Sequence, residues 1–188
     1  SGVAAAPVTA YFTGSVTSID DPFNALSAYQ VGDTVRGSYT YDSGTPDTDP
    51  DPGHGHYFKS QLSTSAFSLE VGGLTTIHDP DLQMEVYNDW PTFNDLFSIG
   101  ASFPASSPCL GGVTILTLKD TTQTAHSSDA LPTGPPVLSN YNIHRGFMAV
   151  FCDLTATESR LNFEITSTSA MAIPTVNTGG LAALARRA

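Results

Sequence analysis

Three aspartates alternate with other residues in one acidic, proline-rich loop. Asp47, Asp49 and Asp51 stand at positions i, i+2 and i+4, and Asp42 precedes them at the end of a strand-like segment. Calcium binds carboxylate and carbonyl oxygens that converge from one loop, and this spacing can supply them. Pro52 stands where an EF-hand has its glycine, so the pattern predicts a looser calcium loop. The alternative is a solvated acidic turn that its prolines stiffen.

Two histidines follow this loop. His54 and His56 are two residues apart, so in an extended chain their imidazoles lie on the same side and can hold zinc or copper with a third ligand. The other histidines that could supply this ligand are distant in sequence: His78, His126 and His144. The alternative is a pair of exposed loop histidines.

No catalytic motif stands out. Gly-x-Ser-x-Gly is absent from the sequence, and the run from His126 to Asp129 only contains the residue types of a catalytic triad. Triad geometry is set by the fold and not by adjacency in sequence, so this run is interpreted as a polar loop. A glycosidase needs a pair of carboxylates, but a chain with 18 acidic residues always contains some such pair. The presence of a pair is therefore no evidence for glycosidase activity. The sequence thus predicts no catalytic residue.

The state of the two cysteines depends on the compartment, which the N-terminal segment indicates. The small residues of the Ala4–Pro7 segment are typical of the end of a signal peptide, which indicates export. In an oxidising compartment, a disulfide between Cys109 and Cys152 is expected. It would close a loop of some forty residues and stabilise the fold by about 3–4 kcal/mol. The alternative is two buried free thiols.

Composition and charge narrow the class of protein and its partners. Charged residues make up 13% of the 188 residues, about half the usual share of roughly 25%, and Ser, Thr, Gly and Pro replace them. This exchange favours strands and turns over helices. A net charge of −11 excludes nucleic acid and disfavours an anionic membrane surface. Divalent cations and neutral glycans remain as partners.

Alternating apolar and polar residues predict about nine short strands. The predicted strands share a period of two or an apolar run between turn residues: 8–17, 34–41, 67–71, 74–77, 82–86, 96–103, 113–119, 147–152 and 161–165. We expect a two-layer antiparallel β-sandwich of the jelly-roll or immunoglobulin-like kind. Residues 8–173 form its single domain. Residues 1–7 are expected to be a signal-peptide remnant or an extended arm, and 174–188 a C-terminal tail.

Several phrases of this sequence occur together in one group of proteins. They are Val31-Gly32-Asp33-x-x-x-Gly37-Ser38-Tyr39-Thr40-Tyr41-Asp42, Thr45-Pro46-Asp47, Phe67-Ser68-Leu69-x-Val71-Gly72-Gly73 and Ser127-Ser128-Asp129-Ala130-Leu131-Pro132-Thr133. In this order the chain resembles the exported β-sandwich proteins of Gram-negative bacteria that carry PEP-CTERM or IPTL-type sorting tails. The resemblance implies export, and anchoring or release by an exosortase-type system in a biofilm setting. It implies no catalytic activity.

The C-terminal tail departs from that group's pattern. Ile173-Pro174-Thr175 and Arg186-Arg187 stand at the expected ends of a sorting tail, but the apolar run between them is only Leu181–Ala185. A membrane span needs about 20 apolar residues, so the sequence predicts no span in this chain.

The leading hypothesis from the sequence is a non-catalytic secreted or cell-surface structural protein. It would self-assemble into filaments or a matrix by strand addition, with residues 1–19 and 161–176 as the donor strands. One alternative is a calcium-dependent carbohydrate-binding module with Asp47, Asp49 and Asp51 at the ion. A second is a secreted hydrolase whose site the sequence does not reveal.

Overall fold

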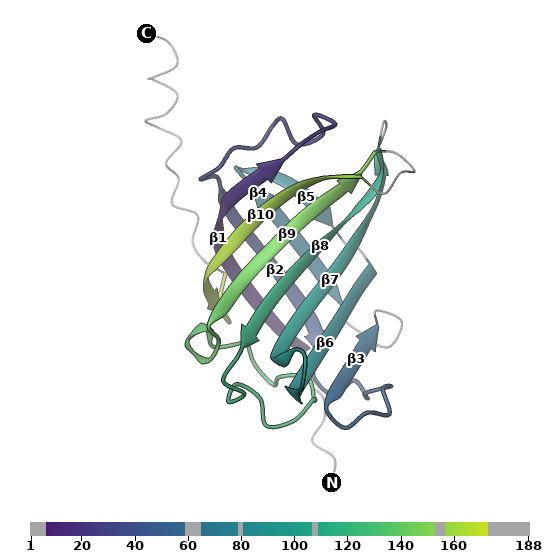
Figure 1. The fold of residues 1–188 in the computed structure, drawn as a ribbon, viewed down its shortest axis with the longest axis vertical. Coiled ribbons are helices and arrows are strands. Elements are labelled where there is room, and N and C mark those ends of the chain that lie inside the picture. Colours follow the sequence, from purple (N-terminus) through teal and green to yellow (C-terminus); the bar gives the residue numbers. More distant parts are fainter. Residues whose placement is uncertain (1–6, 59–64, 79–80, 107–108, 153–156, 173–188) are drawn as a thin grey trace.

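In the described part of the chain, ten strands form one antiparallel sheet (Figure 1). The computed structural model describes residues 7–58, 65–78, 81–106, 109–152 and 157–172. The strands are β1 (Pro7–Asp20), β2 (Thr34–Asp42), β3 (His54–Phe58), β4 (Ala66–Val71), β5 (Leu74–His78), β6 (Asp81–Trp90), β7 (Asn94–Ser106), β8 (Cys109–Asp120), β9 (Ile143–Phe151) and β10 (Glu158–Ser169). A short 3₁₀ turn, η1 (Leu138–Asn140), precedes β9. The order across the sheet is β3-β6-β7-β8-β9-β10-β1-β2-β4-β5.

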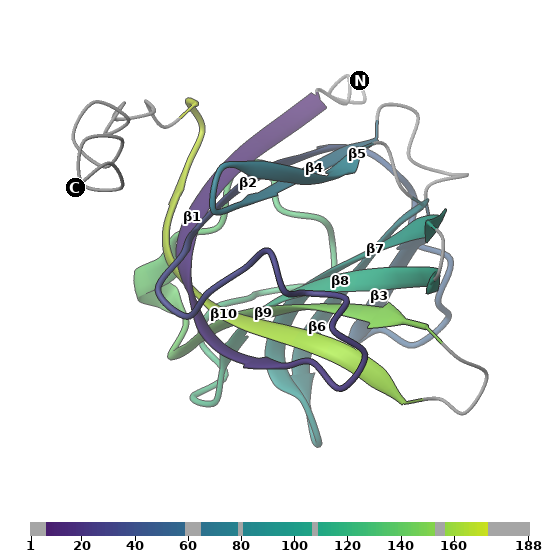
Figure 2. The same ribbon diagram turned by 90° about the horizontal axis from the view of Figure 1, so that it is seen from above.

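The sheet curls until its two halves face each other. Seen from above, β2, β4 and β5 lie on one side of an open curl, and β6 to β9 lie on the other (Figure 2). Strand β1 pairs with β2 on one edge and β10 on the other, so hydrogen bonds run continuously round the bend. The β1–β10 register shifts twice, at Thr13/Gly14 and Val16/Ser18, and such bulges bend a strand. The all-β antiparallel prediction is confirmed, with one curled sheet where two separate layers were expected.

The core fills the inside of the curl. The inward residues of each strand are apolar, as in the run from Val8 to Val16, where every second residue apart from Gly14 is a buried apolar side chain. Aromatic rings join the two halves: Tyr39 on β2 lies 6.1 Å from Phe97 on β7, between ring centroids. Phe12 on β1 contacts both Tyr39 and Phe67. Side chains from the two halves of the sheet therefore meet inside the curl.

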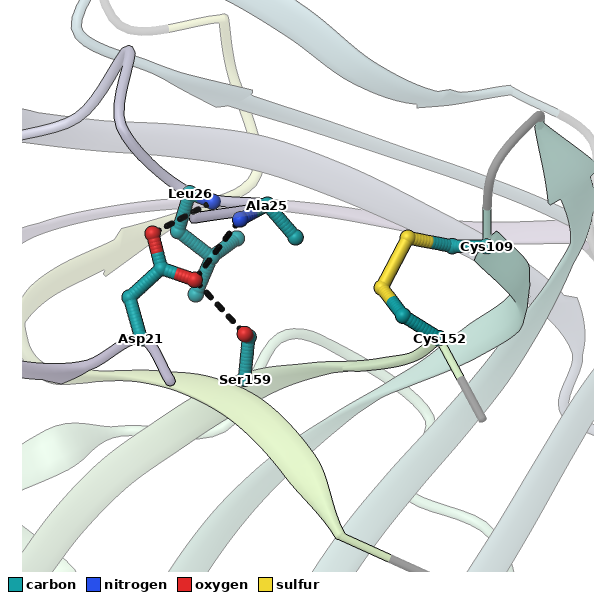
Figure 3. Close-up of a disulfide and its surroundings, with 6 residues drawn as sticks. All are labelled: Asp21, Ala25, Leu26, Cys109, Cys152 and Ser159. Atoms are coloured by element: carbon teal, nitrogen blue, oxygen red, sulfur yellow. Dashed lines mark hydrogen bonds between the residues drawn. A yellow bond between two sulfur atoms is a disulfide. The ribbon is translucent and has the colours of Figure 1, made fainter. Parts of the chain in front are cut away.

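Two long connections cover the ends of the curl. Between β1 and β2, both carboxylate oxygens of Asp21 accept main-chain N–H groups, from Ala25 at 2.7 Å and Leu26 at 2.8 Å (Figure 3). The Ser159 hydroxyl donates to the same carboxylate at 2.6 Å, which fixes the Leu26 side chain in the core. At the other end, the connection between β8 and β9 places Leu131 in the core.

The disulfide joins Cys109 to Cys152, as the sequence predicts (Figure 3). Cys109 opens β8 and Cys152 directly follows β9, so the bond links two neighbouring strands where both leave the sheet. The two cysteines are 43 residues apart in sequence. A disulfide over this separation restricts the unfolded chain, which raises the free energy of unfolding by about 3–4 kcal/mol.

Two details differ from the sequence-based prediction, and two predicted segments are not described. Strand β3 was not expected, because its residues were assigned to the acidic loop and the segment leaving it. Residues 1–19 and 161–176 were expected to donate strands to a neighbouring copy, whereas β1 and β10 pair with each other in the middle of this chain's own sheet, between β2 and β9. The sorting-tail residues 173–188 and the arm at 1–6 lie outside the described residues.

Candidate functional site at the edges of the sheet

The acidic loop between β2 and β3 is folded by its own carboxylates. Asp47 Oδ1 accepts the N–H of Asp49, Asp49 Oδ1 accepts that of Asp51, and Asp51 Oδ1 accepts that of Gly53, all at 2.9–3.0 Å. Asp42 does the same for Gly44 at the start of the loop, at 2.9 Å. Aspartate favours this local bond to the residue two positions on, so the i, i+2, i+4 spacing generates three consecutive turns.

The same loop covers the outer edge of β3. On the inner side β3 pairs with β6, while the N–H of His56 on the outer side donates to Asp47 Oδ1 at 2.9 Å. The Thr48 hydroxyl donates to the carbonyl of His56 at 3.1 Å, and the N–H of His54 donates to the carbonyl of Asp51 at 3.1 Å. Hydrogen-bonding groups that a sheet edge normally offers to another strand are therefore occupied. Asp47 has a double role, because one oxygen holds both the loop and the strand.

His54 and His56 lie on the outer face of β3 with nearly parallel rings. Their ring centroids are 5.7 Å apart, with an angle of 21° between the planes. His54 Nδ1 is 3.0 Å from Asp49 Oδ2, and His56 Nε2 is 3.8 Å from Glu85 Oε1 on β6. The lone pairs of an imidazole lie in its ring plane, so near-parallel rings at this separation do not aim both nitrogens at one ion.

The other predicted metal ligands are placed elsewhere. The Nε2 of His144 lies 2.7 Å from the carbonyl of Tyr141, and His126 Nε2 is 3.3 Å from the Tyr141 hydroxyl. The side chain of His78 lies outside the described residues. Among the residues that the structure describes, no three His, Cys, Asp or Glu side chains gather as a metal-binding group. Calcium at Asp42, Asp47, Asp49 and Asp51 stays a prediction.

Aromatic rings continue from these histidines along β3 and β6. His54 stacks on Tyr87 with ring centroids 4.2 Å apart, and Tyr87 contacts Phe93 at 5.0 Å. At the other end, His56 packs against Phe58 at 4.2 Å. Burial, together with the charge of Glu85, raises the pKa of Tyr87 to about 12, so its hydroxyl stays protonated at neutral pH. This row of rings fixes β3 on β6.

The opposite edge of the sheet is built differently. Strand β5 follows β4 through the two-residue turn Gly72-Gly73, whose φ angles of 59° and 84° suit glycine. Its sequence, Leu74 to His78, contains no Asp, Glu, Lys or Pro, the residues that commonly block edge pairing. The Leu74 side chain is 48% exposed. In the part of the chain that the structure describes, β5 is last in the strand order and no segment pairs with its outer edge.

A pair of buried carboxylates lies far from both sheet edges in the strand order. Asp95 on β7 and Asp120 on β8 are cross-strand partners. Asp95 accepts the N–H groups of Asp89 and His126, at 2.9 and 2.8 Å. Hydrogen bonds from Thr122 hold the pKa of Asp120 well below its usual range, and burial lowers the pKa of His126 against the attraction of the two carboxylates. Each carboxylate accepts main-chain N–H groups of a loop, so their role is structural.

Comparison with protein-family models, curated protein sequences and solved structures finds no match for this chain. The described part of the chain contains no helix with the length and apolar character that a membrane span requires.

The sequence alone did not show which residues cover the outer edge of β3. Asp47 was assigned to a calcium loop or to a solvated acidic turn, and neither interpretation includes its bond to the N–H of His56 on β3. Thr48 was not singled out, and nothing in the sequence indicates that its hydroxyl reaches His56. Glu85 was read only as the polar partner in an alternating strand, since its neighbours on β3 and β7 depend on strand order.

Proposed function

We propose that this protein is a non-catalytic secreted structural protein whose copies pair edge to edge along β5. The observation that carries the proposal is the contrast between a covered edge at β3 and an uncovered, uncharged edge at β5. An exposed strand edge without charged side chains or proline is a template for strand addition. The resemblance of the sequence to exported, sorted proteins supports the secreted location.

A second copy of the chain is the partner that fits this edge. Antiparallel pairing of β5 with itself about a two-fold axis joins two sheets into one, and an isologous contact of this kind closes on itself. Each copy has a net charge of −11, so contact is least repulsive where both surfaces are neutral, as β5 is. With β5 as the one free edge among the described residues, the product is a pair, and a matrix would be built from such pairs through other contacts.

The test is the mass of the protein in solution. The paired strand has five residues, so the contact is small and we expect a dimer that forms with rising concentration, at micromolar levels or above. Light scattering after size exclusion should show dimers for the wild type. T75K, which places a charge on the exposed edge, should give monomers.

The matched control is T166K, at an exposed position on β10, a strand in the middle of the sheet. It should dimerise like the wild type and melt at a similar temperature. A wild type that stays monomeric up to millimolar concentration, or a T75K variant that dimerises as the wild type does, would overturn the proposal.

A further inference from the structure

A trough runs over β7 on the outer face of the sheet. The outward residues of β7 are small, Ser98, Gly100 and Ser102, while their neighbours on β6 and β8 are larger. A Cβ atom at Gly100 would meet only the Gln83 carbonyl, at 4.0 Å, so nothing fills the space above this glycine. The resulting trough has a volume of about 480 Å³, within the range of roughly 300–1,000 Å³ that is usual for ligand sites.

The two walls of the trough differ in chemistry. Cross-strand register places Gln83 on β6 and Ile115 on β8 on opposite sides of Gly100. The β6 wall carries the amide of Gln83 and the carboxylate of Glu85, and the β8 wall carries Val113 and Ile115. Phe58 on β3, the cross-strand partner of Gln83, also lines the trough. A ligand in this trough therefore meets the hydrogen-bonding groups of β6 on one side, and apolar side chains from β8 and at Phe58.

Glu85 is held in place as a hydrogen-bond acceptor. Gln83 Nε2 donates to its Oε1 at 2.9 Å, and His56 Nε2 lies 3.8 Å from the same oxygen. Its other oxygen, Oε2, has only a long contact of 3.5 Å with the Tyr87 hydroxyl, which leaves that oxygen able to accept a stronger bond. A hydroxyl that donates to a carboxylate makes one of the stronger hydrogen bonds of proteins.

We propose that this trough binds a segment of an uncharged polysaccharide. A sugar ring has hydroxyl groups round its rim and C–H groups on its faces, which matches one hydrogen-bonding wall and one apolar wall. The acceptor Glu85 and the amide of Gln83 suit neighbouring hydroxyls, which both donate and accept. An anionic polysaccharide is disfavoured by Glu85 and by the net charge of −11. The inference does not depend on pairing at β5.

The binding test uses native gels that contain a soluble neutral polysaccharide. The neutral polysaccharides would be β-glucan, xylan, mannan and hydroxyethyl cellulose. Parallel gels with alginate or polygalacturonate would test anionic polysaccharides, and a poly-lysine pull-down would test a cationic polymer. The wild type should be retarded by at least one neutral polysaccharide. G100L fills the trough where the backbone leaves room and should weaken retardation at least tenfold, and E85Q should weaken it less.

The control for folding and surface change is T166L, an exposed position on β10 outside the trough. It should bind like the wild type, and G100L should melt within a few degrees of it. Retardation by none of the neutral probes, binding only to an anionic or cationic probe, or equal binding by G100L and T166L would each overturn the inference.

A second readout separates this inference from pairing at β5. Monomeric T75K should still be retarded in the gel but should no longer cross-link the polysaccharide into a precipitate. If T75K is retarded in the gel and the wild type is a monomer in solution, pairing at β5 is overturned and binding in the trough is supported. A dimeric wild type without retardation by any neutral polysaccharide would overturn the trough and keep pairing.

Discussion

The two edges of this sheet are treated in opposite ways. At β3, side chains and the main chain of the acidic loop bind the outward groups of His54 and His56, and a row of aromatic rings fixes the strand. At β5, a two-residue turn and a short neutral strand leave the edge without a partner in the described residues. Both strands have five residues, so the difference comes from the neighbouring loop and not from strand length.

The largest effect is expected from uncovering β3. D47A removes the acceptor of the His56 and Asp49 N–H groups, which should lower the free energy of unfolding by about 1–2 kcal/mol. Each copy would then have two free edges, so the closed pair should be replaced by open-ended chains. Light scattering and electron microscopy would detect species far larger than a dimer.

D47N is the matched control for this prediction. Its amide oxygen can still accept both N–H groups, so D47N should remain a dimer although it loses the same charge as D47A. If D47A also remains a dimer, or if D47N forms chains to the same extent, then the carboxylate of Asp47 does not protect this edge.

A smaller effect on assembly, although not on stability, is expected at Asp120, which accepts loop N–H groups away from both edges. Its folded pKa lies below the usual value of about 3.9, so it contributes stability above pH 4 that is progressively lost as the pH falls below 4. D120N should lower the free energy of unfolding by about 1–3 kcal/mol at pH 7 and flatten this acid dependence. Thermal melts between pH 3 and 7 would measure both.

The same variant sharpens the comparison of the edges. D120N should destabilise at least as much as D47A, yet it should stay a dimer because it uncovers no edge. Chains of D120N would instead mean that general destabilisation, and not loss of the cap on β3, drives assembly.

The smallest effect concerns calcium at the acidic loop. Each of Asp47, Asp49 and Asp51 uses Oδ1 for main-chain N–H groups, and Asp49 Oδ2 lies 3.0 Å from His54 Nδ1, so an ion at Asp49 would compete with His54 for that oxygen. If calcium binds there, millimolar calcium should raise the melting temperature by a few degrees over a chelator, since a ligand of the native state stabilises it. The same melting temperature in calcium and chelator, in the wild type and in D51N, would contradict the calcium prediction.

The strands were predictable where they bury every second side chain. The stretch from Val8 to Val16 is an example, because inward and outward residues differ in polarity at each step. Strand β3 was not predictable, since its outward His54 and His56 and its inward Gly55 resemble a loop. The Cys109–Cys152 bond was predictable from two cysteines in a chain that the sequence analysis expects to be exported.

The order of the strands in the sheet could not be predicted from local sequence patterns. A period of two tells which side chains point inward, but not which strands are neighbours. The curl depends on pairing of β1 with β10, and the trough depends on β6, β7 and β8 being adjacent. Glu85 and Gly100 therefore had no recognisable role until the strands were placed. The capping role of Asp47 was hidden because turns and calcium loops share one spacing.

The seam between β1 and β10 has a consequence for how the chain folds. It joins the first and last strands, and one of its side-chain hydrogen bonds, between Thr13 and Ser167, spans 154 residues. Contacts this distant in sequence must close a large loop before they yield any stabilisation, and they slow folding. Until β10 arrives, β1 is itself an edge strand. The middle of the finished sheet is thus the last part that a nascent chain can complete, and the stage before completion is the one most exposed to misassembly.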